Sequence, residues 1–295
     1  MKNDLIYIAI IIAKSILNAV PRRLALRVGA FAGGVWYLLG TNDRKTAIKQ
    51  IMFALHYPEN KANGLARACF EEMGRNLCDV IRMGKWSKGF MERIVRVEGF
   101  EHFEKAYARG KGVLALTGHI GNFELLAAWF SYCKGVKVSV IGRQLYDKRL
   151  DRMLLAQRRH FGLENIPTTA SPLALLKTFR EGRALGVLLD QDSSKISGLF
   201  VDFFGKKANT AAGPVFIARK TGTPIVPMAI YREGECRYLI RVLPPLEINW
   251  TNDRRSDMLT ALGRCNRALE ELIRYDPVQW VWIHNRWRNR PPGEK

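Results

Sequence analysis

The chain has 295 residues, of which 47% are hydrophobic and 25% charged. This length and composition allow a sizeable buried core, which excludes wholesale disorder. The 47 Lys and Arg residues against 27 Asp and Glu give a formal net charge of +20. Such an excess predicts an anionic partner: a nucleic acid, an acidic membrane surface, or an acidic carrier or substrate.

The cysteines and histidines show no pattern of a disulfide framework or a metal site. The five cysteines are odd in number and contain no CxxC pair. Reduced thiols that serve mainly in packing are therefore expected. The five histidines are scattered along the chain without zinc-ligand spacing. We expect no metal ion and no cofactor.

The N-terminal region contains two apolar stretches. Residues 5–13 (LIYIAIIIA) are uninterrupted apolar sequence before Lys14, about half of the roughly 20 residues that a membrane-spanning helix needs. Residues 24–39 form a second stretch, preceded by Arg22. We predict two helices that lie in the membrane interface, with their basic residues at the headgroups. A signal peptide and a buried helical hairpin are the alternatives.

The remaining periodicities predict an α/β protein. Helical spacing over residues 43–86 is interrupted near Pro58, and a short alternating strand follows at 95–99. From residue 112 onward, apolar runs alternate with helical segments. The runs lie at 112–117, 137–142, 184–190 and 224–230, and the helices at 123–132, 148–160, 173–181, 213–221 and 255–274. This order predicts a mixed, mostly parallel sheet flanked by helices.

Three regions follow from this pattern. Residues 1–40 are predicted to be a membrane-associated helical anchor, residues 41–110 a helical N-terminal region, and residues 111–295 an α/β domain. The C-terminal tail is aromatic, and the alternation of Trp280 with Trp282 predicts an edge strand whose rings lie near the membrane interface. His284, within this tail, is expected to have a structural role.

The best candidate for catalysis is the segment TGHIGNFE at residues 117–124. It places His119 just beyond an apolar strand, where open α/β sheets bind their ligands. Glu124 falls in the first turn of the next helix, and Gly118 and Gly121 allow a sharp turn between the two. A carboxylate bonded to one imidazole nitrogen makes the other nitrogen a general base for a hydroxyl group. The spacing alone has low specificity, since a surface histidine followed by a helix-capping glutamate gives the same pattern.

These residues resemble the H-x4-D/E signature of the glycerolipid acyltransferase superfamily, whose fold is glycerol-3-phosphate acyltransferase-like. More narrowly, the chain resembles the lipid A biosynthesis acyltransferase family, whose members add lauroyl or myristoyl chains to lipopolysaccharide precursors. The similarity extends over nearly the whole chain. Besides the segment at 117–124, it covers residues 42–58, 74–77, 190–192, 201–205 and 277–287.

The resemblance implies a membrane acyltransferase at the cytoplasmic face of the inner membrane, with acyl carrier protein as the donor. His119 and Glu124 would be catalytic. Candidate substrate-binding residues lie in the motif or at strand ends and basic segments near it. They are Gly121, Asn122, Arg143, Arg158, Arg159, Asp190, Asp192, Lys206 and Lys207. Backbone N–H groups near Gly121, or a nearby basic residue, would hold the oxyanion.

Several alternatives remain at this level. Acyl-CoA could replace the carrier protein, and the acceptor could be a lysophospholipid or a phosphatidylinositol mannoside. The arginines could form a solvated basic face, and Phe203 and Phe204 could be core residues instead of a lip above an acyl-chain mouth. From a different class, the charge also permits a nucleic-acid-binding protein. No recognisable binding module supports that alternative, so we expect no nucleic acid partner.

Overall fold

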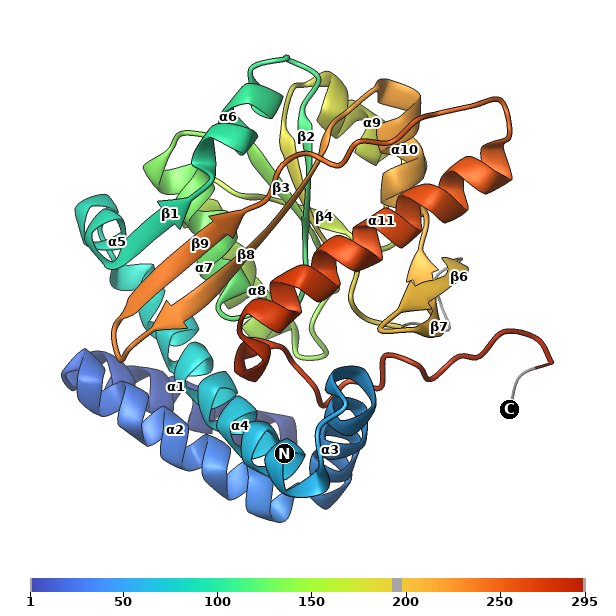
Figure 1. Ribbon diagram of the computed structural model, residues 1–295. Coiled ribbons are helices and arrows are strands. Elements are labelled where there is room, and N and C mark those ends of the chain that lie inside the picture. Colours follow the sequence, from blue (N-terminus) through green and yellow to red (C-terminus); the bar gives the residue numbers. More distant parts are fainter. Residues whose placement is uncertain (1, 193–197, 294–295) are drawn as a thin grey trace.

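The computed structural model describes residues 2–192 and 198–293. Its centre is a seven-stranded sheet with the order β1-β9-β8-β2-β5-β3-β4 (Figure 1). The strands are β1 (Val95–Glu98), β2 (Val113–Thr117), β3 (Val138–Gly142), β4 (Glu164–Pro167), β5 (Ala184–Leu188), β8 (Ile225–Glu233) and β9 (Arg237–Val242). Neighbouring strands run parallel except β8 and β9, which are antiparallel. The predicted mixed, mostly parallel sheet is confirmed.

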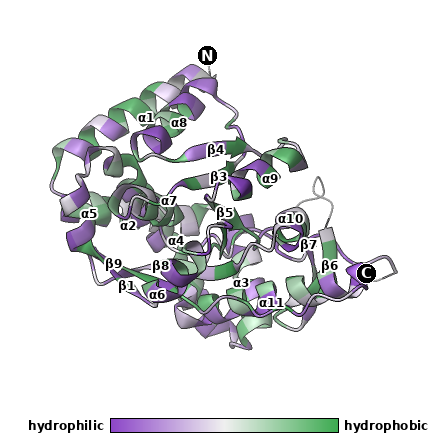
Figure 2. Cartoon of the chain, turned by 90° about the horizontal axis from the view of Figure 1, so that it is seen from above, coloured by the Kyte–Doolittle hydropathy of each residue, from purple (hydrophilic) through white to green (hydrophobic). Residues whose placement is uncertain are grey.

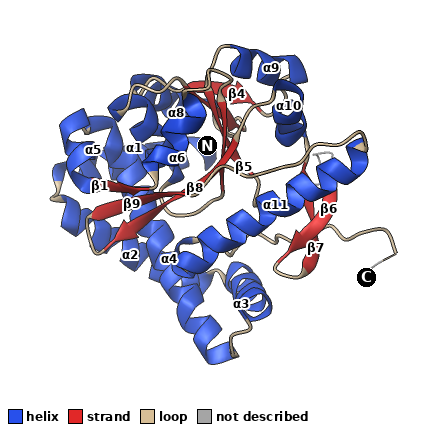
Figure 3. Cartoon of the chain, turned by 45° about the horizontal axis from the view of Figure 1, so that its top comes forward, coloured by secondary structure: helices blue, strands red, loops and turns tan. Residues whose placement is uncertain are grey.

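The four apolar runs of the sequence coincide with β2, β3, β5 and β8. They are apolar throughout because helices cover the sheet on both sides (Figure 3). In β2, for example, Leu114 and Leu116 belong to one core cluster, while Val113 belongs to the cluster on the opposite face. The sheet begins at β1, which pairs with β9. A separate antiparallel hairpin consists of β6 (Gly198–Phe203) and β7 (Lys206–Ala211).

The helices surround this sheet. They are α1 (Lys2–Ala19), α2 (Arg22–Leu39), α3 (Thr41–Leu55), α4 (Glu59–Arg82), α5 (Lys88–Ile94), α6 (Phe100–Tyr107), α7 (Phe123–Ala128), α8 (Lys148–His160), α9 (Pro172–Arg180), α10 (Gly213–Thr221) and α11 (Arg254–Tyr275). A π-helical turn, Trp129–Cys133, continues α7. Helices α1 to α4 gather at one end of the sheet, and α11 crosses one of its faces (Figure 1).

Helix α2 packs against α4 with the two backbones in direct contact. A Cβ atom on Gly33 would lie 2.1 Å from the carbonyl oxygen of Phe70, so only glycine allows this approach. A buried ion network continues the contact into the sheet. Both carboxylate oxygens of Asp79 accept hydrogen bonds from Arg22 of α2 at 2.8 Å, and Arg232 of β8 donates to Asp79 at 2.9 Å. The N-terminal helices are therefore joined firmly to the α/β body.

The opposite faces of α1 and α2 are apolar and exposed. On α1, Ile8, Ile12 and Ile16 are each about half exposed, and on α2, Phe31 and Leu38 are mostly exposed. Figure 2 shows this hydrophobic colouring along α1, which lies beside α8. No single helix in the described part of the chain is long and apolar enough to cross a bilayer. Among the described helices, α2 and α3 meet that criterion as a pair, and the pair is bent by 92°.

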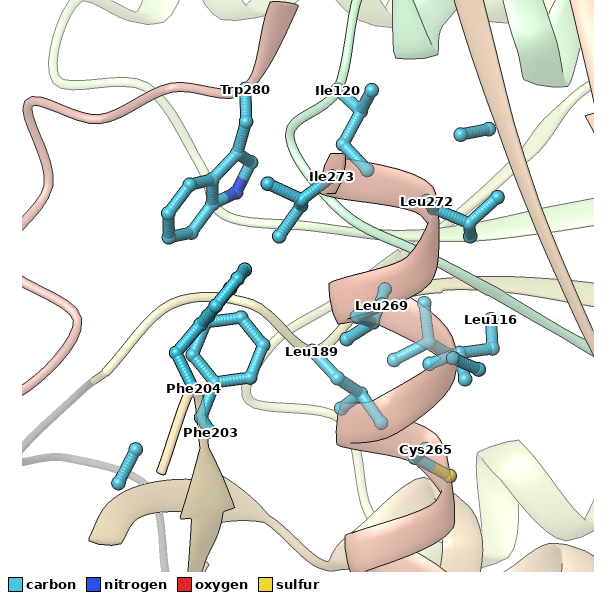
Figure 4. Close-up of a cluster of buried hydrophobic side chains, with 14 of the residues drawn as sticks. Leu116, Ile120, Leu189, Phe203, Phe204, Cys265, Leu269, Leu272, Ile273 and Trp280 are labelled. Carbon is cyan, nitrogen blue, oxygen red and sulfur yellow. The ribbon is translucent and has the colours of Figure 1, made fainter. Parts of the chain in front are cut away.

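The C-terminal tail differs from the predicted edge strand. It begins with a 3-10 turn, Pro277–Gln279, and its other described residues are irregular apart from an isolated bridge between Ile120 and Trp280. Trp280 and Trp282 are both almost completely buried. Figure 4 shows the Trp280 ring beside Phe203 and Phe204, where the ring centroids of Phe203 and Trp280 are 5.8 Å apart. The prediction was wrong because the described part of the tail has no strand ladder and both indoles are packed in the core, whereas the predicted edge strand would hold them near the membrane interface.

Candidate active site

His119 lies two residues beyond β2, and Asp190 lies two residues beyond β5. These strands are parallel neighbours with Thr117 opposite Leu188, so the same register brings His119 opposite Asp190. The His119 Nδ1 atom lies 2.9 Å from Asp190 Oδ1, and the His119 backbone N–H donates to Oδ2 at 2.7 Å. Gly118 permits the approach, since a Cβ there would lie 3.0 Å from the carboxyl carbon of Asp190.

The Asp190 carboxylate is buried and fully hydrogen-bonded. The indole Nε1 of Trp280 donates to its Oδ2 at 2.7 Å, which gives the aromatic tail a place in the site. Burial favours the protonated acid, but the imidazole of His119 and the donated hydrogen bonds outweigh burial and lower the pKa of Asp190 to about 2. Asp190 therefore stays ionised at neutral pH and fixes Nδ1 of His119 as a donor. The other ring nitrogen, Nε2, is left to accept a proton.

Glu124 does not make the expected hydrogen bond to His119. Its carboxylate instead accepts two hydrogen bonds from Arg158 of α8, at 2.5 Å from Nη2 and 3.1 Å from Nε. The side chain beside the imidazole is Phe123, whose ring stands edge-on to it at a centroid distance of 5.1 Å. The idea that Glu124 orients His119 is therefore corrected: among the described residues, Asp190 is the carboxylate that contacts the imidazole.

Gly121 and Asn122 have structural partners. Gly121 has a φ of +56°, and a Cβ there would lie 2.0 Å from the carbonyl oxygen of Ile230, so both the turn and the packing require glycine. Its N–H donates to the carbonyl of Gln279 at 2.8 Å and is thus not free for an oxyanion. The side chain of Asn122 accepts from the Leu125 N–H and caps α7. These contacts position the loop that carries His119.

A cavity of about 200 Å³ opens beside His119, between the sheet and α7. Its interior is apolar, and its rim carries the polar groups His119, Glu124, Arg143 and Arg158. The inner lining includes Phe103, Leu126, Phe130, Val140, Leu188 and Met228. Arg143 is exposed and has no hydrogen-bond or ion-pair partner in the described part of the chain. An apolar pocket with a basic rim suits a hydrocarbon chain that ends in a polar or anionic group.

The other predicted binding residues lie elsewhere. Arg159 is exposed on α8, one residue beyond Arg158. Asp192 is buried, and its carboxylate holds the tail by accepting from the backbone and side chain of Asn289 at 2.6 and 2.8 Å. Lys206 and Lys207 lie on the β6–β7 hairpin, where Lys207 pairs with Asp202 at 3.2 Å. None of these four lines the cavity at His119.

The orienting role of Asp190 and the indole donor Trp280 were missed in the sequence. Asp190 was expected only as a substrate contact, and Trp280 only as a packing residue. The sequence does indicate that Asp190 lies at a strand end, because Asp190 follows an apolar run as His119 does. What was missing was the knowledge that β5 is the strand next to β2.

The chain is similar to several known acyltransferases. The chain is 27% identical over 227 residues to the lipid A biosynthesis lauroyltransferase of Escherichia coli (strain K12), covering 76% of this chain and 72% of that protein. It is 23% identical over 279 residues to the phosphatidylinositol mannoside acyltransferase of Mycolicibacterium smegmatis, covering 92% and 88%. A lipid A biosynthesis palmitoleoyltransferase of E. coli is 21% identical over 273 residues, with 92% and 86% covered.

Among solved structures, the 1-acyl-sn-glycerophosphate acyltransferase PlsC from Thermotoga maritima is similar at a TM-score of 0.39 and 13% sequence identity, over 85% of this chain and 97% of that one. The family profile described as bacterial lipid A biosynthesis acyltransferase matches residues 2–289. This match spans the helical N-terminus, the sheet and the aromatic tail, so the chain belongs to the bacterial lipid A biosynthesis acyltransferase family.

Proposed function

We propose that this acyltransferase moves a fatty acyl chain from an acyl carrier protein thioester to a hydroxyl group of an anionic glycolipid. The acceptor we favour is a lipid A precursor. The observation that carries the proposal is the His119–Asp190 contact at the rim of an apolar cavity. It supplies an oriented general base beside a space that suits an acyl chain.

The reaction proceeds in two steps. The acceptor hydroxyl gives its proton to Nε2 of His119 while its oxygen bonds to the thioester carbonyl carbon. The resulting tetrahedral oxyanion then collapses, and the C–S bond breaks. The departing sulfur takes the proton from Nε2, which restores neutral His119. Asp190 stabilises the imidazolium between the two steps and stays ionised throughout, since its pKa is held at about 2.

The oxyanion requires a donor, and the rim arginines supply it. The Gly121 N–H is engaged with Gln279 and is therefore excluded. Arg158 is held in place by Glu124, which leaves Arg143 as the cation that can turn toward the substrate. We assign Arg143 and Arg158 to the developing negative charge or to an acceptor phosphate. In this assignment Glu124 is essential because it positions Arg158.

The membrane is the expected location of the reaction. The exposed apolar faces of α1 and α2 bear Ile12, Phe31 and Leu38, with Arg23 and Arg27 also exposed on α2. Apolar side chains with basic neighbours favour an anionic lipid surface. We propose that residues 1–40 anchor the enzyme there, at the cytoplasmic face of the inner membrane. The net charge of +20 also favours an acidic carrier protein as the donor.

A second acceptor class has specific support. The relatives divide between lipid A acyltransferases and phosphatidylinositol mannoside acyltransferases. A phosphatidylinositol mannoside or a lysophospholipid, acylated from acyl-CoA, is therefore the alternative. Both alternatives use the same base and the same acyl pocket, and they differ in the acyl donor and in the headgroup that the basic rim accepts.

The test uses the purified full-length protein in mixed micelles. Acyl carrier protein or CoA carrying a lauroyl or myristoyl group is the donor, and a lipid A precursor, a phosphatidylinositol mannoside and a lysophospholipid are offered separately. We expect the lipid A precursor to gain one acyl chain by mass spectrometry, and His119→Ala to abolish the gain without loss of folding. Transfer at the native rate by His119→Ala would refute the mechanism. Preferred acylation of one of the other two lipids would identify that lipid, and not a lipid A precursor, as the acceptor.

A further inference from the structure

A second cavity lies on the other side of Glu124 from the cavity at His119. It has a volume of about 320 Å³ and lies between α4, α8, the start of α7 and residues 278–281 of the tail. Phe123 and Glu124 line both cavities. The two cavities therefore meet at these two side chains, and His119 lies on the rim of the first.

The walls of this second cavity are mostly apolar, and the charged side chains among them are paired. Met73, Leu77 and Val80 of α4 face Phe123, Leu154 and Val281 across it. Its two carboxylates carry no free charge: Glu124 is paired with Arg158, and Glu72 is paired with the buried guanidinium of Arg232. Asn76, Asn122 and Gln279 add polar atoms to the lining, and each already makes a hydrogen bond within the protein. A hydrocarbon chain leaves these bonds in place and fills the mostly apolar space.

The position of the cavity indicates where its occupant comes from. Leu77, one of its lining residues, is 61% exposed. It lies on α4, and α4 is the helix against which both α1 and α2 pack. The exposed apolar faces of α1 and α2 are the surface that we assign to the membrane. The second cavity thus opens from the helical layer that carries the lipid-facing surface.

We propose that the second cavity binds a hydrocarbon chain already present on the acceptor lipid, while the transferred acyl chain occupies the cavity at His119. The proposal rests on the proposed function and adds to it a rule of substrate selection. An acceptor that carries its own chain is anchored with its hydroxyl group near Nε2 of His119. An acceptor without a chain has the same headgroup but lacks this anchor.

Kinetics of matched tryptophan variants test this rule. Leu154→Trp fills the cavity from α8, and Met73→Trp fills it from α4. Ala156→Trp introduces the same side chain on the exposed side of α8 and serves as the control. Each variant is first checked for an unchanged melting temperature. The acceptors are a lipid A precursor with its primary acyl chains and the same headgroup after removal of all its acyl chains.

We expect Leu154→Trp and Met73→Trp to raise the KM for the acylated precursor by about tenfold, equivalent to roughly two methylenes kept out of an apolar site. The KM for the chain-stripped precursor should not change, and Ala156→Trp should alter neither. Equal KM values for all variants, or an equal rise with both acceptors, would overturn the pocket assignment. Absence of transfer by the wild-type enzyme would instead refute the proposed function.

Photocrosslinking provides a second test that needs no turnover. A lipid A precursor with a diazirine in a primary chain should label peptides of residues 69–80 and of α8. A non-hydrolysable acyl thioether of CoA with a diazirine in its chain should label peptides of α7 and β3. Labels in the reverse arrangement would show that the two cavities have exchanged roles and would overturn the inference.

Discussion

The substitution Asp190→Asn tests which carboxylate orients His119: Glu124, as the sequence motif suggests, or Asp190, as the structure shows. Oδ2 of Asp190 accepts from the His119 N–H and from Trp280 Nε1, both at 2.7 Å, and Oδ1 faces Nδ1 at 2.9 Å. An asparagine whose side-chain oxygen takes the place of Oδ2 keeps the hydrogen bonds from the His119 N–H and from Trp280. Its NH2 group then faces Nδ1 as a donor, which moves the imidazole proton to Nε2 and removes the general base.

We therefore expect Asp190→Asn to lower kcat by about 10³- to 10⁴-fold, or roughly 4–5.5 kcal/mol in activation free energy. The assay is acyl transfer from carrier protein to lipid by the purified enzyme between pH 6 and 9. Nitrogen NMR of labelled histidine should show the exchanged tautomer of His119. A kcat within about threefold of wild type, with the wild-type tautomer, would refute the orienting role of Asp190.

The same variant tests a pH dependence of stability. The pKa of Asp190 is lowered from 3.8 to about 2, so its ionisation stabilises the folded state fully above pH 4, and this stabilisation is lost as the pH falls toward 2. The loss should amount to roughly 2 kcal/mol in the free energy of unfolding. Denaturant unfolding at pH 5 and pH 2.5 should show this component in wild type and not in Asp190→Asn. An equal acid dependence in both proteins would contradict the low pKa.

Three further predictions concern the ion pair and the N-terminal helices. Glu124→Gln and Arg158→Lys should each lower kcat/KM by about 10- to 100-fold. Because the two residues act as a unit, the double variant should be no less active than the less active single variant. Additive losses in the same transfer assay would contradict this. Gly33→Ala should lower the free energy of unfolding by about 1–3 kcal/mol, since the new Cβ would lie 2.1 Å from a carbonyl oxygen of α4. In Gly34→Ala the new Cβ would meet nothing closer than 3.9 Å, so this variant should raise the free energy of unfolding by about 0.5–1 kcal/mol. Thermal denaturation of the Gly33→Ala and Gly34→Ala variants compares the two effects. Phe31→Asp should weaken binding to anionic vesicles by about tenfold or more without lowering the melting temperature, as measured by vesicle sedimentation; unchanged binding would exclude this face of α2 from the membrane contact.

Elements with a strong local pattern were predicted well. The runs that became β2, β3, β5 and β8 are apolar because both faces of these strands are buried, and that property can be read along the chain. By contrast, β4 contains a proline, and β7 (KKANTA) has little apolar alternation. Both are strands because a neighbour supplies hydrogen bonds, which a local pattern does not record.

The aromatic tail shows the same limit in another form. Alternation of Trp280 and Trp282 has the period of a strand, yet the two rings contact each other at a centroid distance of 4.4 Å inside the core. Trp280 also donates to Asp190, 90 residues earlier in the chain. The burial of an indole and the choice of its hydrogen-bond partner depend on long-range packing, so the local pattern predicted the wrong element.

From the sequence alone came the α/β class and the candidate base His119, placed beyond a buried strand and before a glycine turn. Those features depend on residues that are neighbours along the chain. Only the tertiary structure decided which carboxylate orients the imidazole. Glu124, five residues away, is held by Arg158 of α8, whereas Asp190 meets His119 because β5 lies beside β2 in a register that aligns the two strand ends. Strand order and register are set by the packing of the whole sheet, so a short motif cannot specify them.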